Sequence, residues 1–327
     1  MGEILEMVSK RAQSRHVDGE LDPSSRLIIA EAERRGIAVD VLAPRAEYFR
    51  LRHGEKAVTC RESLSDRTSA VALSRCDDKR TTARILRDAG LRVPVQREAG
   101  KASENEAFLR EHGALVVKPA DGEQGKGVCV GIRAPAALAL AIDQAAQVSA
   151  RVLLEECVAG DDVRLIVIDG EVVVAGMRRP PRIRGDGSRS VRALIAALSE
   201  QRARETFGES HIPVDDETAR CVREAGFALD DVLPRDAEIA VRKGANLHTG
   251  GTIEDVTAHI HPALVEVAKR AAAALEIPVV GLDLMVPRVD GTDYWIIEAN
   301  ERPGFAHHEP QPVAERFVDF LFPETRQ

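Results

Sequence analysis

The sequence predicts a mixed α/β (α+β) fold, with a small N-terminal α/β unit ahead of two larger α+β subdomains. Three patterns support this prediction: amphipathic helical runs, short apolar runs typical of buried strands, and Asp-Gly pairs that mark hairpin turns. The length of 327 residues is enough to bury a full core in two or three compact domains. We place the N-terminal unit at 1–75 and a larger domain at 76–327, with subdomains at 110–178 and 179–327.

The first elements are helices with clear end signals. After Pro23 the run LIIAEAERRGIAVDVLAP predicts a helix that ends at Gly36, followed by a short strand. The run CDDKRTTARILRDAGLRVP predicts a second helix, because Asp77 and Asp78 favour a helix N-terminus and Gly90 favours a C-terminus. This helix leads into the larger domain.

The middle of the chain alternates strands with one helix. LVVKPADGEQGKGVCVGI, at 115–132, reads as two strands around a glycine-containing loop, and APAALALAIDQAAQ reads as a helix. VLLEECVAGDDVRLIVIDGEVVVAGM adds a strand and then a hairpin that turns at Asp169-Gly170. The order β, β, α, β, β predicts one small sheet with one helix between 115 and 177.

A hairpin near the C-terminus brings oxygen-bearing side chains together. IHPALVEVAKRAAAALEI predicts a helix, and GLDLMV and YWIIEAN predict strands joined around Asp290-Gly291. Strand side chains alternate, so Glu298 and Asn300 share a face, and the antiparallel partner brings Asp283 close. Two carboxylates and an amide oxygen suit Mg²⁺, which shares its shell with substrate phosphates. The alternative is a capped strand end.

Two further segments indicate an anionic ligand. The loop DGEQGKG at 121–127 can point backbone N–H groups at an anion, although a plain hairpin loop remains the alternative. Lys118 stands on the apolar strand before this loop, where a cation needs an anionic partner. The edge segment Glu155 to Val158 could offer backbone groups to a purine, with Asp162 on the ribose hydroxyls; a charged strand end at the surface is the alternative.

An arginine-rich segment interrupts this acidic protein. With its glycine hinges it predicts a clamp over a phosphate or a carboxylate substrate, and a solvated basic loop is the alternative. Its six arginines are Arg178, Arg179, Arg182, Arg184, Arg189 and Arg192.

Composition excludes several classes of protein. The net charge of −8, a pI near 5.7 and only 3% aromatic residues argue against a nucleic-acid partner. No apolar run approaches the roughly 18 residues that span a bilayer, and the N-terminal run does not resemble a signal peptide. Five widely spaced cysteines fit reduced thiols. We expect a cytoplasmic protein with small-molecule substrates and no membrane partner.

Taken together, these runs resemble an ATP-grasp carboxylate–amine ligase over residues 76–312. The resemblance is carried by CDDKRTTARILRDAGLRVP, VVKPADGEQGKGV, LLEECVAGDDVRLIVIDGEVV, RRPPRIRGDGSRSVRALI, RKGANLHTGGTIEDVT, VVGLDLMV and IIEANERPG. Within the family they are similar to the ligase part of cyanophycin synthetases. ANLHTGGTIEDVTAHIHPALVE and EANERPGFAHHEPQPVAERFVDFLFP are most similar to N-acetylglutaminylglutamine synthetases.

The resemblance implies an ATP-grasp fold whose two subdomains grip ATP between them. It implies ATP and Mg²⁺ as cofactors, and it implies that Asp283, Glu298 and Asn300 hold the metal ion. Mn²⁺ is the alternative ion. The nucleotide contacts that it implies are Lys79, Lys118, Gly122, Gly125, Lys126, Gly127, Glu155, Glu156, Val158 and Asp162. The catalytic residues that it implies are Arg178, Arg179, Arg242 and Asn246.

The implied reaction joins an acylated amino acid to an amino acid, most specifically N-acetylglutamine to glutamine. Cyanophycin-type ligases have serine where this chain has His248, which argues against the substrates of cyanophycin synthetases. Proteins similar to N-acetylglutaminylglutamine synthetases often carry an acetyltransferase domain ahead of the ligase, and only residues 1–75 precede Cys76 here, so we do not expect acetyl transfer by this chain. The alternatives are a cyanophycin-synthetase-like or other amino-acid ligase, a kinase of a small acid, and a non-catalytic nucleotide-binding module. The oligomeric state stays open, with a homo-oligomer among the alternatives.

Overall fold

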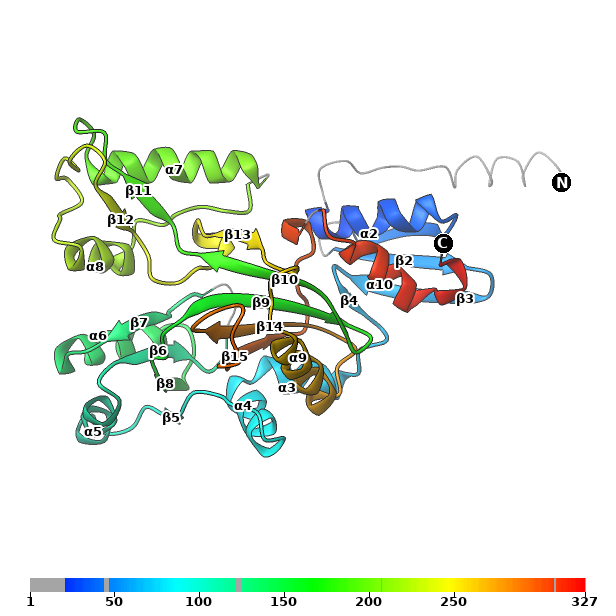
Figure 1. Cartoon of the computed structure of the whole chain (residues 1–327), viewed down its shortest axis with the longest axis horizontal. Coiled ribbons are helices and arrows are strands. Elements are labelled where there is room, and N and C mark those ends of the chain that lie inside the picture. The colour runs from blue at the N-terminus through cyan, green and yellow to red at the C-terminus, as the bar shows by residue number, and fades with distance from the viewer. Residues whose placement is uncertain (1–20, 44–46, 122–124, 207, 309, 327) are drawn as a thin grey trace. The chain divides into compact units, whose positions relative to one another are not determined.

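The chain forms two compact units, one of which contains both ends of the described chain (Figure 1). The computed structural model describes residues 21–43, 47–121, 125–206, 208–308 and 310–326. Unit 1 combines Met1–Arg67 with Gly304–Gln327, and unit 2 is Thr68–Pro303. The predicted domain boundary after residue 75 did not anticipate that the C-terminal segment would pack with the N-terminal one.

Unit 1 is an antiparallel sheet with two helices. The sheet order is β1-β2-β3-β4, and the helices α2 and α10 pack against each other. Its elements are α2 (Pro23–Arg34), β1 (Ala38–Ala43), β2 (Tyr48–His53), β3 (Lys56–Arg61), β4 (Leu64–Ser65), η3 (Ala306–His308), α10 (Val313–Leu321) and η4 (Pro323–Thr325).

A hydrogen bond and one buried arginine join the two segments of unit 1. The Phe305 N–H donates to Ser24 Oγ at 2.9 Å, and the Phe305 ring packs edge to face on Phe317 within the C-terminal segment. The Arg35 side chain is only 3% exposed and pairs with Glu31 at 2.5 Å and with Asp319 at 2.6 Å. A buried guanidinium needs such partners, so α2 and α10 depend on each other.

Unit 2 is built around a five-stranded antiparallel sheet, called the central sheet below. Its order is β13-β10-β9-β14-β15. The strands are β9 (Asp161–Ile168), β10 (Glu171–Arg179), β13 (Thr252–Asp255), β14 (Val279–Val286) and β15 (Trp295–Asn300). The predicted turn at Asp169-Gly170 and the predicted pairing of β14 with β15 are confirmed.

One face of the central sheet is apolar and packs on helices. Alternate residues such as Val163, Leu165, Leu282 and Leu284 are 0% exposed and join a core that extends over α3, α4 and α9. These helices are α3 (Ala70–Asp77), α4 (Lys79–Asp88) and α9 (Pro262–Leu275). The side chains that alternate with these along each strand lie on the opposite face of the sheet.

A second sheet of unit 2 has a core of its own, and we call it the lid sheet. Its order is β5-β8-β6-β7, packed against α5 and α6 (Figure 1). The elements are β5 (Gln96–Glu98), α5 (Ala102–His112), β6 (Leu115–Pro119), β7 (Cys129–Ile132), α6 (Pro135–Ala146) and β8 (Val152–Glu156). The prediction of one small sheet over 115–177 is wrong, because β9 and β10 belong to the central sheet.

The arginine-rich segment begins a third packed group within unit 2. β11 (Arg182–Arg184) pairs with β12 (Glu238–Ala240), and α7 (Val191–Glu205) and α8 (Asp216–Glu224) share a small apolar core with them. The short helix η2 (Leu247–Thr249) follows this group. The arginine-rich segment is therefore not one continuous loop, because it contains the end of β10, the strand β11 and the start of α7.

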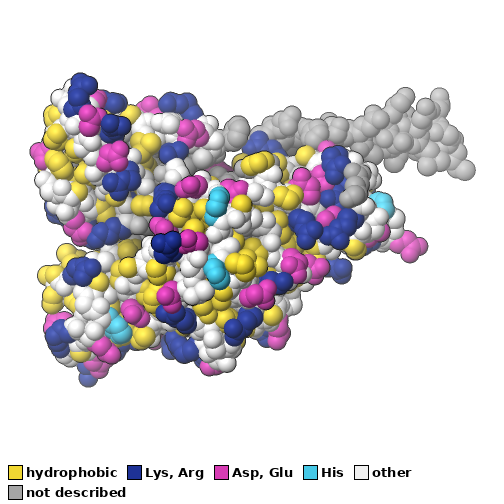
Figure 2. Space-filling model, in the orientation of Figure 1, with side chains coloured by type: hydrophobic (Ala, Val, Ile, Leu, Met, Phe, Trp, Pro, Cys, Tyr) yellow, Lys and Arg dark blue, Asp and Glu magenta, His cyan; other side chains and the backbone are white. Residues whose placement is uncertain are grey.

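Surface charges are mixed in sign. On the face shown in Figure 2, basic and acidic side chains are interspersed. Many of them form exposed pairs such as Arg184–Asp236, which contribute little stability each. Within the described ranges, every helix is too short or too polar to cross a membrane.

The step from the lid sheet to the central sheet depends on Gly160. Its φ of +151° lies in a region that only glycine adopts readily, and an added Cβ would lie 2.6 Å from the Val286 carbonyl oxygen. Gly170 offers a control, because its φ is +76° but nothing lies within 4 Å of an added Cβ.

We expect Gly160→Ala to lower the free energy of unfolding by about 2–4 kcal/mol, since it adds a clash to backbone strain. Gly170→Ala should lower it by about 1 kcal/mol, from strain alone. Urea denaturation of both variants measures the difference. Equal losses would show that the Val286 backbone does not restrict residue 160.

Candidate active site

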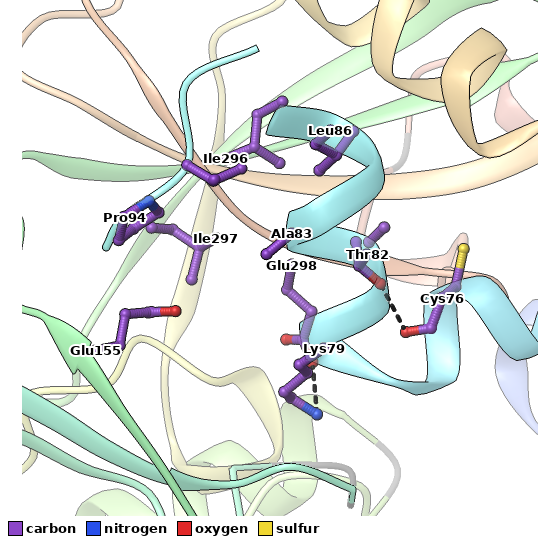
Figure 3. Close-up of a pocket in the computed structure, with 12 residues that line it drawn as sticks. Cys76, Lys79, Thr82, Ala83, Leu86, Pro94, Glu155, Ile296, Ile297 and Glu298 are labelled. Atoms are coloured by element: carbon purple, nitrogen blue, oxygen red, sulfur yellow. Dashed lines mark hydrogen bonds and ion pairs between the residues drawn. The ribbon is translucent and has the colours of Figure 1, made fainter. Parts of the chain in front are cut away.

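A small cleft lies where the lid sheet meets the central sheet. Its walls come from α4, the end of β8 and β15 (Figure 3). Leu86 and Ile296 provide apolar wall, while Lys79, Glu155 and Glu298 bring charge to the same space. Three of the residues predicted from the sequence for nucleotide or metal binding therefore line one cleft.

Lys79 and Glu298 form an ion pair in this cleft. Lys79 is the first residue of α4, and the preceding Asp78 caps the helix by accepting a hydrogen bond from the Thr81 N–H. Lys79 Nζ lies 3.2 Å from Glu298 Oε1. Figure 3 marks this ion pair with a dashed line. The Lys79 side chain is 12% exposed and that of Glu298 is 33% exposed, so the pair can still reach solvent.

Lys118 and Glu155 form a second, more deeply buried pair. They stand on the adjacent strands β6 and β8, and Lys118 Nζ lies 2.7 Å from Glu155 Oε2. The residues are only 5% and 4% exposed. The anionic partner expected for Lys118 is thus a neighbouring side chain, and Glu155 is not a surface strand end.

The polar face of the central sheet holds a charged cluster around Asp283. The strand register places Asp283 opposite Arg164 on β9 and opposite Glu298 on β15. Arg164 donates to both Asp283 oxygens, at 2.7 and 2.8 Å. Arg178 Nη2 lies 2.9 Å from Asp283 Oδ2 and 2.7 Å from Asp162 Oδ1. Both oxygens of the predicted metal ligand Asp283 are therefore bonded to guanidinium groups.

The two aspartates of this cluster, Asp162 and Asp283, ionise differently. Burial raises the pKa of Asp162, and the opposing attraction of Arg178 does not cancel this effect. Burial also disfavours the charged form of Asp283, but Arg164 and Arg178 outweigh it and hold the pKa of Asp283 below its usual range. Asp283 consequently keeps its negative charge more readily than Asp162.

The side chains at this end of β14 and β15 are of the chemical types that bind hard divalent cations, although both Asp283 oxygens are bonded to guanidinium groups. Asn300 donates from Nδ2 to the Gly281 carbonyl at 3.3 Å and to Asp283 Oδ2 at 3.4 Å, which keeps its amide beside that carboxylate. Among the described residues, no group of three or more His, Cys, Asp or Glu side chains is arranged to hold a metal. A set with two carboxylates and an amide suits Mg²⁺, which takes its remaining ligands from water and phosphate.

The glycine loop is described only in part. Gly122 lies outside the described residues, whereas Gly125 and Gly127 have φ of +71° and +70°, as the predicted anion loop requires. Lys126 is exposed. A Cβ added at Gly125 would lie 3.3 Å from the Asn246 Nδ2, so this loop reaches the segment that follows β12.

Other predicted residues have local partners. Arg179 pairs with Asp161 at 2.8 Å, and Arg242 donates to Asp215 at 2.7 Å and to Thr218 at 2.9 Å. Asn246 caps η2 by accepting from the His248 N–H. The structure thus ties Arg179 and Arg242 to carboxylates outside the Asp283 cluster.

The expected edge segment is not at an edge. β8 lies between β5 and β6, so its backbone groups are already used by two neighbouring strands. Glu156 accepts a hydrogen bond from the Val95 N–H at 3.3 Å, and Val158, beyond the end of β8, is half-buried. A purine contact is thus limited to the chain just after the strand.

The arginine-rich segment supplies only Arg178 to the Asp283 cluster. Four of the others form exposed pairs with nearby acidic residues, as a solvated basic segment would; these pairs are Arg182–Glu238, Arg184–Asp236, Arg189–Asp186 and Arg192–Asp230.

Arg164, which donates hydrogen bonds to both Asp283 oxygens, was not predicted from the sequence. The signal was present, because Asp162 and Arg164 alternate with Val163 and Leu165 along β9, as on a strand with one polar face.

Comparisons with known proteins agree with this architecture. Residues 93–229 match the family model of the prokaryotic glutathione synthetase ATP-grasp domain. The crystal structure of a bifunctional glutathione synthetase from Pasteurella multocida superposes with a TM-score of 0.64 at 22% identity, covering 93% of this chain and 44% of that one. The chain therefore carries an ATP-grasp domain, and the predicted fold class is confirmed.

Its sequence relatives include two groups of larger proteins. A cyanophycin synthetase from Nostoc sp. is 32% identical, with 94% of this chain and 36% of that protein covered. The glutathione biosynthesis bifunctional protein GshAB from Enterococcus faecalis is 29% identical, with 93% of this chain and 43% of that protein covered. The predicted resemblance to the cyanophycin synthetase ATP-grasp part is confirmed. The chain spans about two fifths of the length of these relatives.

The buried Lys118–Glu155 pair makes a stability prediction. Lys118→Met should lower the free energy of unfolding by about 3 kcal/mol, because it leaves a buried carboxylate without its cation. Adding Glu155→Gln should restore most of this loss, since no buried charge then remains. Urea denaturation of the single and double variants measures both values, and a single variant as stable as wild type would argue against a buried ionised pair.

Proposed function

We propose that this chain is an ATP-dependent carboxylate–amine ligase that forms an amide through an acyl phosphate. The observation that carries the proposal is the cleft between the lid sheet and the central sheet, where Lys79, Glu155 and Glu298 meet. A buried lysine next to it and a buried carboxylate on the central sheet supply the opposite charges that a metal–nucleotide complex needs.

Each part of the cleft has a role in this proposal. Lys79 and Lys118 contact nucleotide phosphates, and the described part of the glycine loop, Gly125 to Gly127, borders them. The chain after Glu155 borders the base. Asp283, Glu298 and Asn300 would hold Mg²⁺, which offsets phosphate charge when bound. The Arg178 and Arg164 guanidinium groups lie beside this site and can stabilise negative charge on the reacting groups.

The reaction needs no protein nucleophile. A carboxylate oxygen of the first substrate attacks the γ-phosphorus of ATP, and the bond to the β-phosphate oxygen breaks to release ADP. The neutral amine of the second substrate then attacks the acyl carbon. Inorganic phosphate leaves with the electrons of its C–O bond and takes up the proton that the amine nitrogen loses. The side chains of the site act by positioning and by electrostatic stabilisation.

For the substrates, we propose N-acetylglutamine as the acid and glutamine as the amine. The support is the resemblance of residues 245–266 and 298–323 to N-acetylglutaminylglutamine synthetases, together with the basic groups near the cleft. An N-acylated amino acid has lost its ammonium charge and keeps its carboxylate, so arginine can bind it without an acidic partner for an amine.

The substrate proposal predicts the product. With ATP and Mg²⁺, N-acetylglutamine and glutamine should give N-acetylglutaminylglutamine with equal amounts of ADP and phosphate, measured by mass spectrometry and phosphate release. Product formation from unacylated glutamine at the same rate would refute the donor assignment and keep the ligase. A stable phosphorylated acid without free phosphate would indicate a kinase, and no turnover with any acid and amine pair would indicate a binding module.

The metal assignment predicts a loss of turnover in one variant. Glu298→Gln keeps the side-chain volume and deletes the charge, so we expect turnover to fall at least about 100-fold while the fold persists. Glu171→Gln is the control, because Glu171 forms an exposed pair with Lys269 at the far end of β10. Phosphate release measures both rates, and a near-normal rate for a folded Glu298→Gln protein would remove Glu298 from the metal site.

A further inference from the structure

In this structure, the cations expected to bind phosphate lie on carboxylates of the same site. Lys79 pairs with Glu298 at 3.2 Å, and Lys118 pairs with Glu155 at 2.7 Å. Figure 3 shows the Lys79 ammonium directed at Glu298 within the cleft. Each lysine thus already has an anionic partner.

A ligand that arrives alone must therefore break an ion pair. A nucleotide that takes Lys79 leaves the Glu298 carboxylate without this cation, and a metal ion that takes Glu298 leaves Lys79 without this anion. When both ligands arrive, the lysine moves to phosphate and the carboxylate moves to the metal, so each separated group gains a new partner of opposite charge.

We propose that Lys79 and Glu298 form an exchange pair that couples nucleotide binding to divalent-cation binding. This inference rests on the function proposed above. In the ligand-free protein each member blocks the ligand of the other, so the two ligands bind together more tightly than either alone. Such coupling is reciprocal, because each ligand changes the affinity of the other by the same factor.

The geometry favours this pair over Lys118–Glu155. The Glu298 side chain is 33% exposed and the lysine–carboxylate distance is longer, whereas Lys118 and Glu155 are both nearly inaccessible. Opening a pair that reaches solvent leaves both charges hydrated, but opening a buried pair strands them in a medium that solvates them poorly.

Binding measurements without turnover test the proposal. ADP affinity is measured by calorimetry in excess chelator, and Mn²⁺ affinity without nucleotide is measured from the electron paramagnetic resonance signal of free Mn²⁺. Glu298→Gln should bind metal-free ADP about fivefold more tightly than wild type, because it removes the carboxylate charge that pairs with Lys79. Lys79→Met should bind Mn²⁺ without nucleotide more tightly, because it releases Glu298.

The double variant separates exchange from simple repulsion. If Glu298 weakens ADP binding by holding Lys79, the gain from Glu298→Gln disappears in the Lys79→Met background. If Glu298 only repels phosphate, the same gain persists there, and the proposal is overturned. Lys269→Met and Glu171→Gln remove an exposed lysine–glutamate pair with a separation of 3.0 Å and should change neither affinity.

The outcomes also distinguish this proposal from the proposed function. Wild-type protein that binds Mn²⁺ and ADP together, with single variants that show no gain for either ligand alone, overturns the exchange and keeps the nucleotide site. Wild-type protein that binds no ADP with or without metal overturns both. If one single variant does not fold, the absence of a gain in the other still overturns the exchange.

Discussion

A strand sends alternate side chains to opposite faces of its sheet, and this constraint shapes the candidate site. On β9, Val163 and Leu165 enter the core over the helices, so Asp162 and Arg164 must lie on the other face. The same alternation buries Leu282 on β14 and directs Asp283 to the charged side. The apolar residues Val163, Leu165 and Leu282 that fix these strands in the core therefore also fix the charged residues beside them.

The register then decides which charges meet. Asp283 stands opposite Arg164 on one neighbour and opposite Glu298 on the other, so one carboxylate faces a cation and a second carboxylate at once. A one-residue slip would move each of these groups to the opposite face. The packing of the apolar face thus positions the charged groups, and the charged cluster in turn disfavours any other register, because a slip would carry charges into the core.

The sequence identified the local elements better than their partners. The hairpin of β14 and β15 could be predicted, because period-two alternation and an Asp-Gly turn are both local signals. The assignment of β8 and β9 to one sheet failed, since nothing local shows that the chain changes sheet at Gly160. The packing of residues 304–327 with the N-terminal segment was missed for the same reason.

The site residues divide in a similar way. Lys118 and Asp283 could be recognised from the sequence as charges on apolar strands, and both are buried, but their ion-pair partners could not be predicted. The contact of Arg178 with Asp283 joins residues distant in the chain, and its neighbour Arg179 turns to Asp161 instead. Strand alternation and register together determine which arginine of a basic segment reaches a site. Of these two, only the alternation can be predicted from the sequence alone.

Pairing within the site explains how so many charges can stand near a core. Asp283 and Lys118 are 3% and 5% exposed, and neither could stay ionised there without an opposite charge close by. Internal ion pairs let the protein fold without ligand, and the same pairs compete with any ligand that binds those groups. The deeply buried Lys118–Glu155 pair is suited to hold the lid strands together, while the more exposed Lys79–Glu298 pair can exchange partners. Burial therefore sets how costly it is to open each pair when one of its members turns to a ligand.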